Sequence, residues 1–227
     1  MRMLTTSLHA IAMTAKITAP YGSWASPVTA KFITTSGVRL GSPSLDDEDR
    51  LQWLEGRPQE KGRQAVVRYV GGGADGASER GAIDITPTEV NVRTRVHEYG
   101  GGNYAMGPRS VGGGIVYSDF ASQRLYHLKG ADGAEPLCLT PESTCPDGQY
   151  RFADGCFDAA LGFVCVRENH GPKGDASPKD VVNEVVAVPM DGSGDMKVLA
   201  TGNDFFGHPR VSPDGSKLAY VKIGGVV

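Results

Sequence analysis

Residues able to do acid–base or ionic chemistry are most crowded between positions 91 and 102, in the stretch NVRTRVHEYGGG. Arg93, Arg95, His97 and Glu98 lie there beside the three glycines 100–102. Side chains of this kind can form a general acid–base pair or hold a metal ion. Glycines beside them can cradle a phosphate, or can let a strand turn sharply. The spacing of the residues decides among these chemistries.

The spacing argues against a metal site. A zinc-binding H-E-x-x-H helix needs a second histidine where Gly101 stands. The histidines are scattered along the chain, at positions 9, 97, 127, 170 and 208. The acidic run 46–49 favours a solvated hairpin tip over a calcium loop. We therefore expect no metal ligands in this sequence.

Phosphate binding and covalent catalysis are also disfavoured. The glycine runs 71–73, 100–102 and 112–114 precede neither a Lys-Ser/Thr pair nor a helix, so they predict turns and close packing of sheets. A serine nucleophile on a sharp strand-to-helix turn usually lies in G-x-S-x-G, which the sequence does not contain. Ser193, in DGSGD, falls in a polar turn. We therefore predict no catalytic residue in this chain.

The charged residues of the stretch alternate with apolar ones, which predicts an extended strand. Arg93, Arg95 and His97 would share one face, with Val92 and Val96 on the other. Two interpretations stay open. The charges could pair with a neighbouring sheet, or one of Arg93, Arg95 and Glu98 could bind a ligand in a central cavity. These three residues are the substrate-binding candidates.

Composition limits the partners. The 227 residues carry a net charge of -3 and a pI near 6.0, which gives no electrostatic case for nucleic acid or an anionic membrane. No run approaches the roughly 20 apolar residues of a membrane span. The four cysteines match no zinc pattern, and free thiols in a reducing compartment are expected. The opening residues are rich in Ser and Thr and resemble a transit peptide, so the cytoplasm is the first expectation and a chloroplast or other organelle the alternative.

Helix signals are almost missing, while short β-rich runs recur. With 31 glycines and 14 prolines, the chain is broken every few residues. The runs are rich in Val, Ile, Leu and Tyr and are bounded by turn residues, which predicts an all-β protein. They read RLQWLEG, QAVVRYV, GIVYSDF, QRLYHL, LGFVCVRE, NEVVAVPM, KVLAT and KLAYVKI.

These runs repeat in the same order about every 50 residues, which is the period of a β-propeller blade. Each sheet of a propeller is covered on both faces by its neighbours, which agrees with runs that are apolar on both faces. The count gives about three four-stranded blades and the start of a fourth. We therefore predict a partial β-propeller over residues 19–227, preceded by an N-terminal extension over residues 1–18.

The sequence resembles the N-terminal propeller of the prolyl oligopeptidase family of serine peptidases, in the branch of dipeptidyl aminopeptidases and acylaminoacyl peptidases. The similar stretches run from about residue 19 to residue 221. They include APYGSWASPVTA, WLEGRPQEKGR, NVRTRVHEYGGGNYA, RFADG, CVRENH and GNDFFGHPRVSPDGSKLAYV.

In complete members of that family, the resemblance implies, the propeller covers an α/β-hydrolase domain and controls the access of peptides to it, without a cofactor. The hydrolase domain has no counterpart in these 227 residues. We therefore expect a truncated propeller that is inactive alone and whose partners are peptides, together with the hydrolase domain. The alternative is a stand-alone binding or scaffold module that closes by oligomerisation. In either case an open blade edge and an uncovered blade face predict self-association.

Overall fold

The computed structural model describes residues 18–23, 26–34, 37–71, 81–130 and 134–224. The predicted extension 1–18 lies outside these residues apart from Thr18. The chain divides into two units, residues 1–36 and 37–227. In the first, the short helix α1 (Ala30–Thr34) starts after Thr29, whose hydroxyl accepts the Phe32 backbone N–H as an N-cap. No helix in the described ranges is long and apolar enough to cross a membrane.

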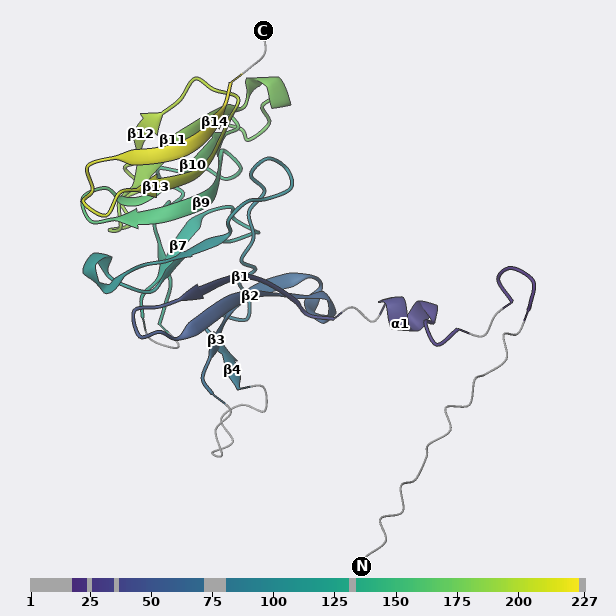
Figure 1. The fold of residues 1–227 in the computed structure, drawn as a ribbon. Coiled ribbons are helices and arrows are strands. Elements are labelled where there is room, and N and C mark those ends of the chain that lie inside the picture. The colour runs from purple at the N-terminus through teal and green to yellow at the C-terminus, as the bar shows by residue number, and fades with distance from the viewer. Residues whose placement is uncertain (1–17, 24–25, 35–36, 72–80, 131–133, 225–227) are drawn as a thin grey trace, which may run out of the picture. The chain divides into compact units, whose positions relative to one another are not determined.

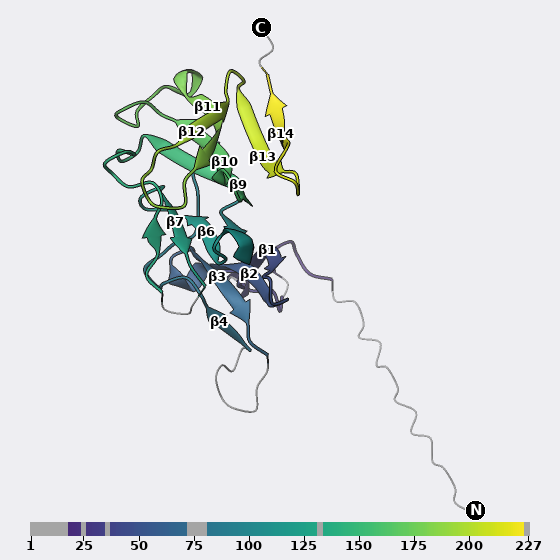
Figure 2. The same ribbon diagram turned by 90° about the vertical axis from the view of Figure 1, so that its left-hand side faces the viewer.

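The second unit is built from antiparallel sheets that follow one another along the chain (Figures 1 and 2). Three sheets have four strands in sequential order and the last described sheet has two. Sheet 1 contains β1 (Arg39–Leu45), β2 (Leu51–Arg57), β3 (Arg63–Tyr69) and β4 (Ala82–Asp84). Sheet 2 contains β5 (Tyr104–Met106), β6 (Ile115–Ser118), β7 (Leu125–Leu128) and β8 (Leu137–Cys138). Sheet 3 contains β9 (Tyr150–Asp158), β10 (Gly162–Asn169), β11 (Val182–Val188) and β12 (Lys197–Ala200), and sheet 4 contains β13 (Phe205–Val211) and β14 (Leu218–Ile223). Short 3-10 turns, η1 (Pro58–Glu60), η2 (Arg109–Val111) and η3 (Pro178–Asp180), lie in the connections.

Each pair of neighbouring sheets encloses its own apolar layer. Alternate residues of one strand supply two different layers, because successive side chains point to opposite faces. In β6, Ile115 and Tyr117 pack toward sheet 1, whereas Val116 packs toward sheet 3. This arrangement explains why the middle strands are apolar on both faces. The layer between sheets 1 and 2 contains Leu54, Val66, Ile85, Val92, Ile115, Tyr117 and Leu128. The layer between sheets 2 and 3 contains Val116, Leu125, Leu139, Phe152, Phe163, Cys165, Val186 and Val188, and that between sheets 3 and 4 contains Val96, Ala153, Val164, Val166, Val185, Ala187 and Phe206.

The first strands of the sheets share a local irregularity. In β1, β9 and β13 the register with the next strand shifts, and the shift contains a residue with positive φ: Ser42, Asp154 or His208. Such β-bulges bend a strand and re-aim its side chains. The first strands also contact one another, β5 with β9 and β9 with β13. Between β1 and β5, the Tyr104 hydroxyl donates to the carbonyl of Ser42 at 2.5 Å.

This is an all-β, propeller-like fold, with no closed ring among the described strands. The predicted fold class is confirmed, as is the predicted count of three four-stranded sheets and the start of a fourth. All eight apolar runs chosen from the sequence are strands. The predicted strand over residues 92–98 is wrong. That segment makes a single β-bridge, between Val92 and Asp119, and then turns.

Removing the Phe152 ring tests the layer between sheets 2 and 3. Phe152 is fully buried there, so Phe152→Ala should lower the free energy of unfolding by about 3 to 5 kcal/mol in urea titrations. Val182→Ala, at an exposed strand position, should change it by less than about 0.5 kcal/mol. Equal effects of the two substitutions would contradict the assigned core.

Candidate functional site

The crossover segment, residues 91–103, is the second part of the connection from the last strand of sheet 1, β4, to the first strand of sheet 2, β5. Its first half is extended, with Val92, Thr94 and Val96 buried and Arg93 and Arg95 exposed. Thr94 therefore lies in phase with the two valines. The alternation is therefore present, but the segment forms no regular strand: Val92 and Arg93 donate their backbone N–H groups to the Gln64 and Ser118 carbonyls, whereas those of residues 94–97 bond to side chains.

A tight turn over residues 96–99 follows. The backbone N–H of Gly100 donates to the carbonyl of Val96 at 2.8 Å, and His97 and Glu98 have φ values of 56° and 65°. Positive φ is costly for residues with a side chain, and such strain persists only where surrounding contacts enforce it. The contacts that enforce this turn come from sheet 3.

Glu168, on β10, is the main anchor of the turn. Its side chain is buried, and Oε1 accepts the backbone N–H of His97 at 2.8 Å. The same oxygen lies 3.1 Å from His97 Nδ1. The two atoms are not aligned for a hydrogen bond, so the contact acts through charge alone. On the other side, Oε2 is 3.0 Å from Nε2 of His170. One carboxylate thus joins two histidines from different parts of the chain.

The environment sets the protonation of this group. The contact with Glu168 raises the pKa of His97 above its ordinary value, against the opposing effect of burial. Burial alone would raise the pKa of Glu168, but hydrogen bonds from His97 and His170 outweigh it and lower that pKa. Both shifts have the direction expected when a carboxylate and an imidazolium stabilise each other.

Asp154, in the bulge of β9, holds the end of the crossover segment. Its Oδ1 accepts the backbone N–H of Gly102 at 2.5 Å, and its own N–H donates to the Gly102 carbonyl at 3.0 Å. A Cβ added at Gly102 would lie 2.8 Å from Oδ1 and 3.3 Å from the Asp154 Cα, so any other residue would force Asp154 to shift. The predicted role of the glycine run in close packing is confirmed at this position.

The substrate-binding candidates lie on the exposed side of the same segment. The guanidinium carbons of Arg93 and Arg95 stack on the Phe120 ring, at 4.8 and 4.5 Å from its centroid. Neither guanidinium pairs with a carboxylate of the described residues. Glu98, whose side chain is 79% exposed, accepts a hydrogen bond from Arg151 Nη1 at 2.6 Å. The charged surface consisting of Arg93, Arg95 and Glu98 therefore offers two cations that stack on Phe120 without an ion-pair partner among the described residues, and one carboxylate paired with Arg151.

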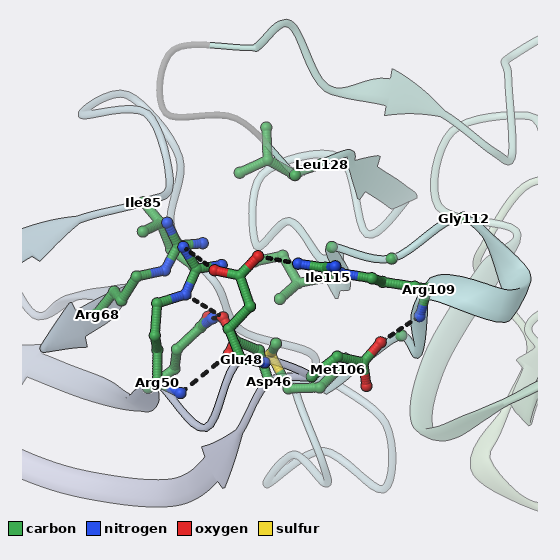
Figure 3. Close-up of a pocket in the computed structure, with 16 residues that line it drawn as sticks. Asp46, Glu48, Arg50, Arg68, Ile85, Met106, Arg109, Gly112, Ile115 and Leu128 are labelled. Carbon is green, nitrogen blue, oxygen red and sulfur yellow. Dashed lines mark hydrogen bonds and ion pairs between the residues drawn. The ribbon is translucent and has the colours of Figure 1, made fainter.

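A pocket of about 270 Å³ lies between two turns, one over residues 46–50 of sheet 1 and one over residues 107–114 of sheet 2 (Figure 3). Arg50 pairs with Asp46 at 2.7 Å and with Glu48 at 2.9 Å. Glu48 also pairs with Arg109. Burial raises and the Arg50 contacts lower the pKa of Asp46, with a net decrease. The acidic run is the hairpin tip predicted from the sequence. Its ion pairs hold the turn together and connect it to the second turn through Arg109.

The described residues contain no group of three His, Cys, Asp or Glu side chains placed to hold a metal ion. The charged surface has groups suited to binding a polar or charged ligand. Exposed guanidinium groups match carboxylates and peptide carbonyls, and an exposed carboxylate matches an amine.

Solved structures were compared with the fold. A structure of a puromycin-hydrolysing peptidase from Mycobacterium tuberculosis matches 92% of this chain, with a TM-score of 0.76 and 32% identity. A crystal structure of puromycin hydrolase matches 91%, with a TM-score of 0.72 and 33% identity. A variant of puromycin hydrolase complexed with PGG matches 91%, with a TM-score of 0.72 and 34% identity. The chain is similar to puromycin-hydrolysing peptidases.

The likeness to these peptidases covers one part of them. The chain spans 31% of the length of each matched peptidase chain. No family model and no curated protein matches the chain. The structural match supports the resemblance to the prolyl oligopeptidase family that the sequence showed.

Sequence reasoning missed Glu168 and Asp154, although both lie in stretches noted for the family resemblance, CVRENH and RFADG. A buried acidic residue at the end of an apolar strand was the available signal. Its partner could not be read from the sequence, because 71 positions separate Glu168 from His97.

Replacing Glu168 with glutamine should change stability in a pH-dependent way. The raised pKa of His97 stabilises the fold fully below the unfolded value near 6.5, and this contribution is lost as pH rises through the folded pKa. The lowered pKa of Glu168 stabilises the fold above about 4.3 and is lost as pH falls through its folded pKa. Glu168→Gln should therefore cost most, about 2 kcal/mol, between pH of roughly 4.3 and 6.5. Urea titrations across pH measure this, and a constant cost from pH 4 to 9 would show that the charge has no role.

Adding one methyl group at Gly102 should separate the crossover segment from β9. Gly102→Ala should destabilise the chain by roughly 1 to 3 kcal/mol, because the Asp154 contacts must move. Gly41→Ala is the matched control, since a Cβ at Gly41 meets nothing within 4 Å. If thermal unfolding shows the two variants equally stable, the close approach is not a constraint.

Proposed function

We propose that this chain is the N-terminal propeller part of a prolyl-oligopeptidase-type serine exopeptidase, of the dipeptidyl or acylaminoacyl class. In this role it controls the access of peptides to a hydrolase domain. The observation that carries the proposal is the match of at least 91% of the chain, at 32 to 34% identity, to 31% of three peptidase structures. The rest of each matched peptidase chain leaves room for a catalytic domain.

The charged surface supports a part in substrate binding. Arg93 and Arg95 are held in place by their shared contact with Phe120, and the Arg95 backbone N–H donates to Gln123 Oε1 at 2.8 Å. A fixed guanidinium loses less entropy when it binds a carbonyl or carboxylate. Glu98 is suited to the protonated amine of a peptide terminus. This binding needs no cofactor.

The chemistry of bond cleavage is assigned to the hydrolase domain. The sequence contains no G-x-S-x-G, and the crossover segment presents a histidine–carboxylate contact without a serine or cysteine nucleophile in it. The 227-residue chain is therefore proposed to be inactive alone.

A second candidate is a stand-alone scaffold module. The observation that favours it is the exposed apolar surface at both ends of the row of sheets, which includes Leu40 and Ile223. Such surface is typical of a protein-interaction site.

Peptidase activity tests the proposal in two steps. The purified chain should not hydrolyse aminoacyl 4-nitroanilides or puromycin, and should not react with a fluorophosphonate probe. A chimaera in which the chain replaces the matched part of puromycin hydrolase should react with the probe and hydrolyse the substrates. Hydrolysis by the isolated chain would contradict the proposal. So would a chimaera that reacts with the probe yet turns over no substrate.

In that chimaera, the double substitution Arg93→Ala/Arg95→Ala tests the substrate-binding candidates. The loss of a charge-assisted hydrogen bond should raise KM about tenfold, with kcat changed by less than about threefold. Arg39→Ala, at another exposed arginine, should leave both parameters unchanged. Unchanged KM in the double variant would remove these arginines from the binding site.

A further inference from the structure

Gln123 is an unusual residue for the connection between β6 and β7. It is only 5% exposed and its φ is 56°, a conformation that favours glycine or asparagine. The turn closes without the Gln123 side chain. The Asp119 carbonyl accepts the backbone N–H of Gln123 at 2.8 Å, and the Asp119 carboxylate accepts that of Ser122 at 3.0 Å. The buried amide of Gln123 therefore has a purpose outside the turn.

That amide joins the two residues whose side chains stack on the charged surface. Its Oε1 accepts the backbone N–H of Arg95 at 2.8 Å, and its Nε2 donates to the carbonyl of Phe120 at 2.8 Å. Arg95 carries a guanidinium and Phe120 carries the ring over which that guanidinium lies. One side chain thus sets the distance between the backbone of the cation and the backbone of its ring.

The other backbone groups of these two residues are also bound. The carbonyl of Arg95 accepts a hydrogen bond from Arg151 Nη1 at 3.2 Å, and the N–H of Phe120 donates to the carbonyl of Asn91 at 2.8 Å. Arg151 lies on β9 of sheet 3, so the backbone of Arg95 is held from two sheets. A cation–π contact at an exposed site is weak by comparison. The position of the guanidinium therefore depends on the bonds to its backbone.

The charges of the surface favour an anionic ligand. The guanidinium carbons of Arg93 and Arg95 are 4.8 and 4.5 Å from one ring centroid, without an ion-pair partner among the described residues. The carboxylates of Glu98 and Asp119, on the same two segments, are engaged by other side chains. Neighbouring like charges repel, and an anion relieves the repulsion. A carboxylate brings a full charge and two oxygens that match a guanidinium, whereas a peptide carbonyl brings one neutral oxygen.

We propose that Gln123 is a positioning residue of the charged surface, and that the group it prepares Arg95 to bind is a carboxylate. The carboxylate belongs to a peptide, either at its C-terminus or on an acidic side chain. Gln123 does not touch this ligand and acts through Arg95. A guanidinium that is already held in place loses less conformational freedom on binding. The inference rests on the proposed function, because it takes the charged surface as the substrate-binding surface.

Nuclear magnetic resonance of the 227-residue chain tests the positioning without a ligand. The Phe120 ring should shift the side-chain protons of Arg95 upfield, and Arg95→Lys identifies these signals. Gln123→Met keeps the size of the side chain but not its amide, and should remove most of the upfield shift. Gln123→Asn should have the same effect because it is one methylene shorter, although asparagine tolerates the positive φ and keeps the turn folded.

Titration of the same samples with blocked peptides tests the ligand. Acetyl-trialanine carries a C-terminal carboxylate, acetyl-Ala-Glu-Ala amide carries a side-chain carboxylate, and acetyl-trialanine amide carries neither. The unmodified chain should bind at least one carboxylate peptide, which identifies the source, and should not bind the neutral one. Both Gln123 variants should weaken this binding about three- to tenfold, as expected for a side chain that must be immobilised on binding.

Thr140→Val is the matched control. Thr140 is also buried, and its Oγ1 accepts a backbone N–H from β7 of the same sheet, that of Leu125, at 3.0 Å. Its loss should leave both the upfield shift and the binding unchanged. Equal weakening of binding by Thr140→Val would overturn the positioning role, because a general loss of stability would then explain the effect.

The two parts of the proposal fail separately. An unchanged upfield shift in both Gln123 variants would overturn the positioning role and leave the proposed function as it stands. Equal binding of the neutral peptide would overturn the assignment of a carboxylate. If the unmodified chain binds none of the peptides, the inference is overturned together with the substrate-binding part of the proposed function.

Discussion

The contact between Glu168 and the turn at His97 is the interaction on which the succession of sheets depends. It fixes the segment that leaves sheet 1 and enters sheet 2 by attaching it to a strand of sheet 3. A carboxylate buried without partners would be costly, and two adjacent residues with positive φ would also be costly. Here each cost is offset by the same hydrogen bonds. The turn gains an enforced conformation and the carboxylate gains donors.

Asp154 repeats this solution at the other end of the crossover segment. It too has positive φ, and it uses one carboxylate oxygen to hold the Gly102 backbone. Ahead of these two anchors along the chain, the apolar side chains of the segment enter two different layers, Val92 the one between sheets 1 and 2 and Val96 the one between sheets 3 and 4. Polar contacts thus set the register of the sheets, while apolar layers supply most of the stabilisation.

The sequence predicted the middle strands well because they are buried on both faces. Runs such as LGFVCVRE leave no other arrangement for so many apolar side chains. It did not predict the first strands, because β1, β9 and β13 contain bulges that interrupt the pattern. The segment with Arg93 and Arg95 alternates like a strand, yet from residue 94 to residue 97 its backbone donors bond to side chains, such as Asn103 for Thr94. Local alternation cannot distinguish these two partners. Glu168 and Asp154 could not be predicted as anchors for a different reason, because contacts across more than 50 positions leave no periodic pattern in the sequence.

The same arrangement relates structure to the proposed function. Glu168 and Asp154 bind the backbone of the crossover segment on the side that faces sheet 3. The side chains of Arg93, Arg95 and Glu98 remain exposed on a backbone that these hydrogen bonds hold in place. A binding surface gains affinity when its groups are held before the ligand arrives. The crowded charges are thus divided between structure and surface, with His97 serving the first and the two arginines serving the second.

A double-mutant cycle between His97 and Glu168 tests this account most directly. Urea unfolding of the unmodified chain, His97→Ala, Glu168→Gln and the double variant at pH 5.5 gives the coupling free energy between the two residues. If the contact anchors the crossover segment, the coupling should be at least about 1 kcal/mol, and the double variant should be little less stable than the worse single variant. Additive losses, with a coupling near zero, would contradict the account.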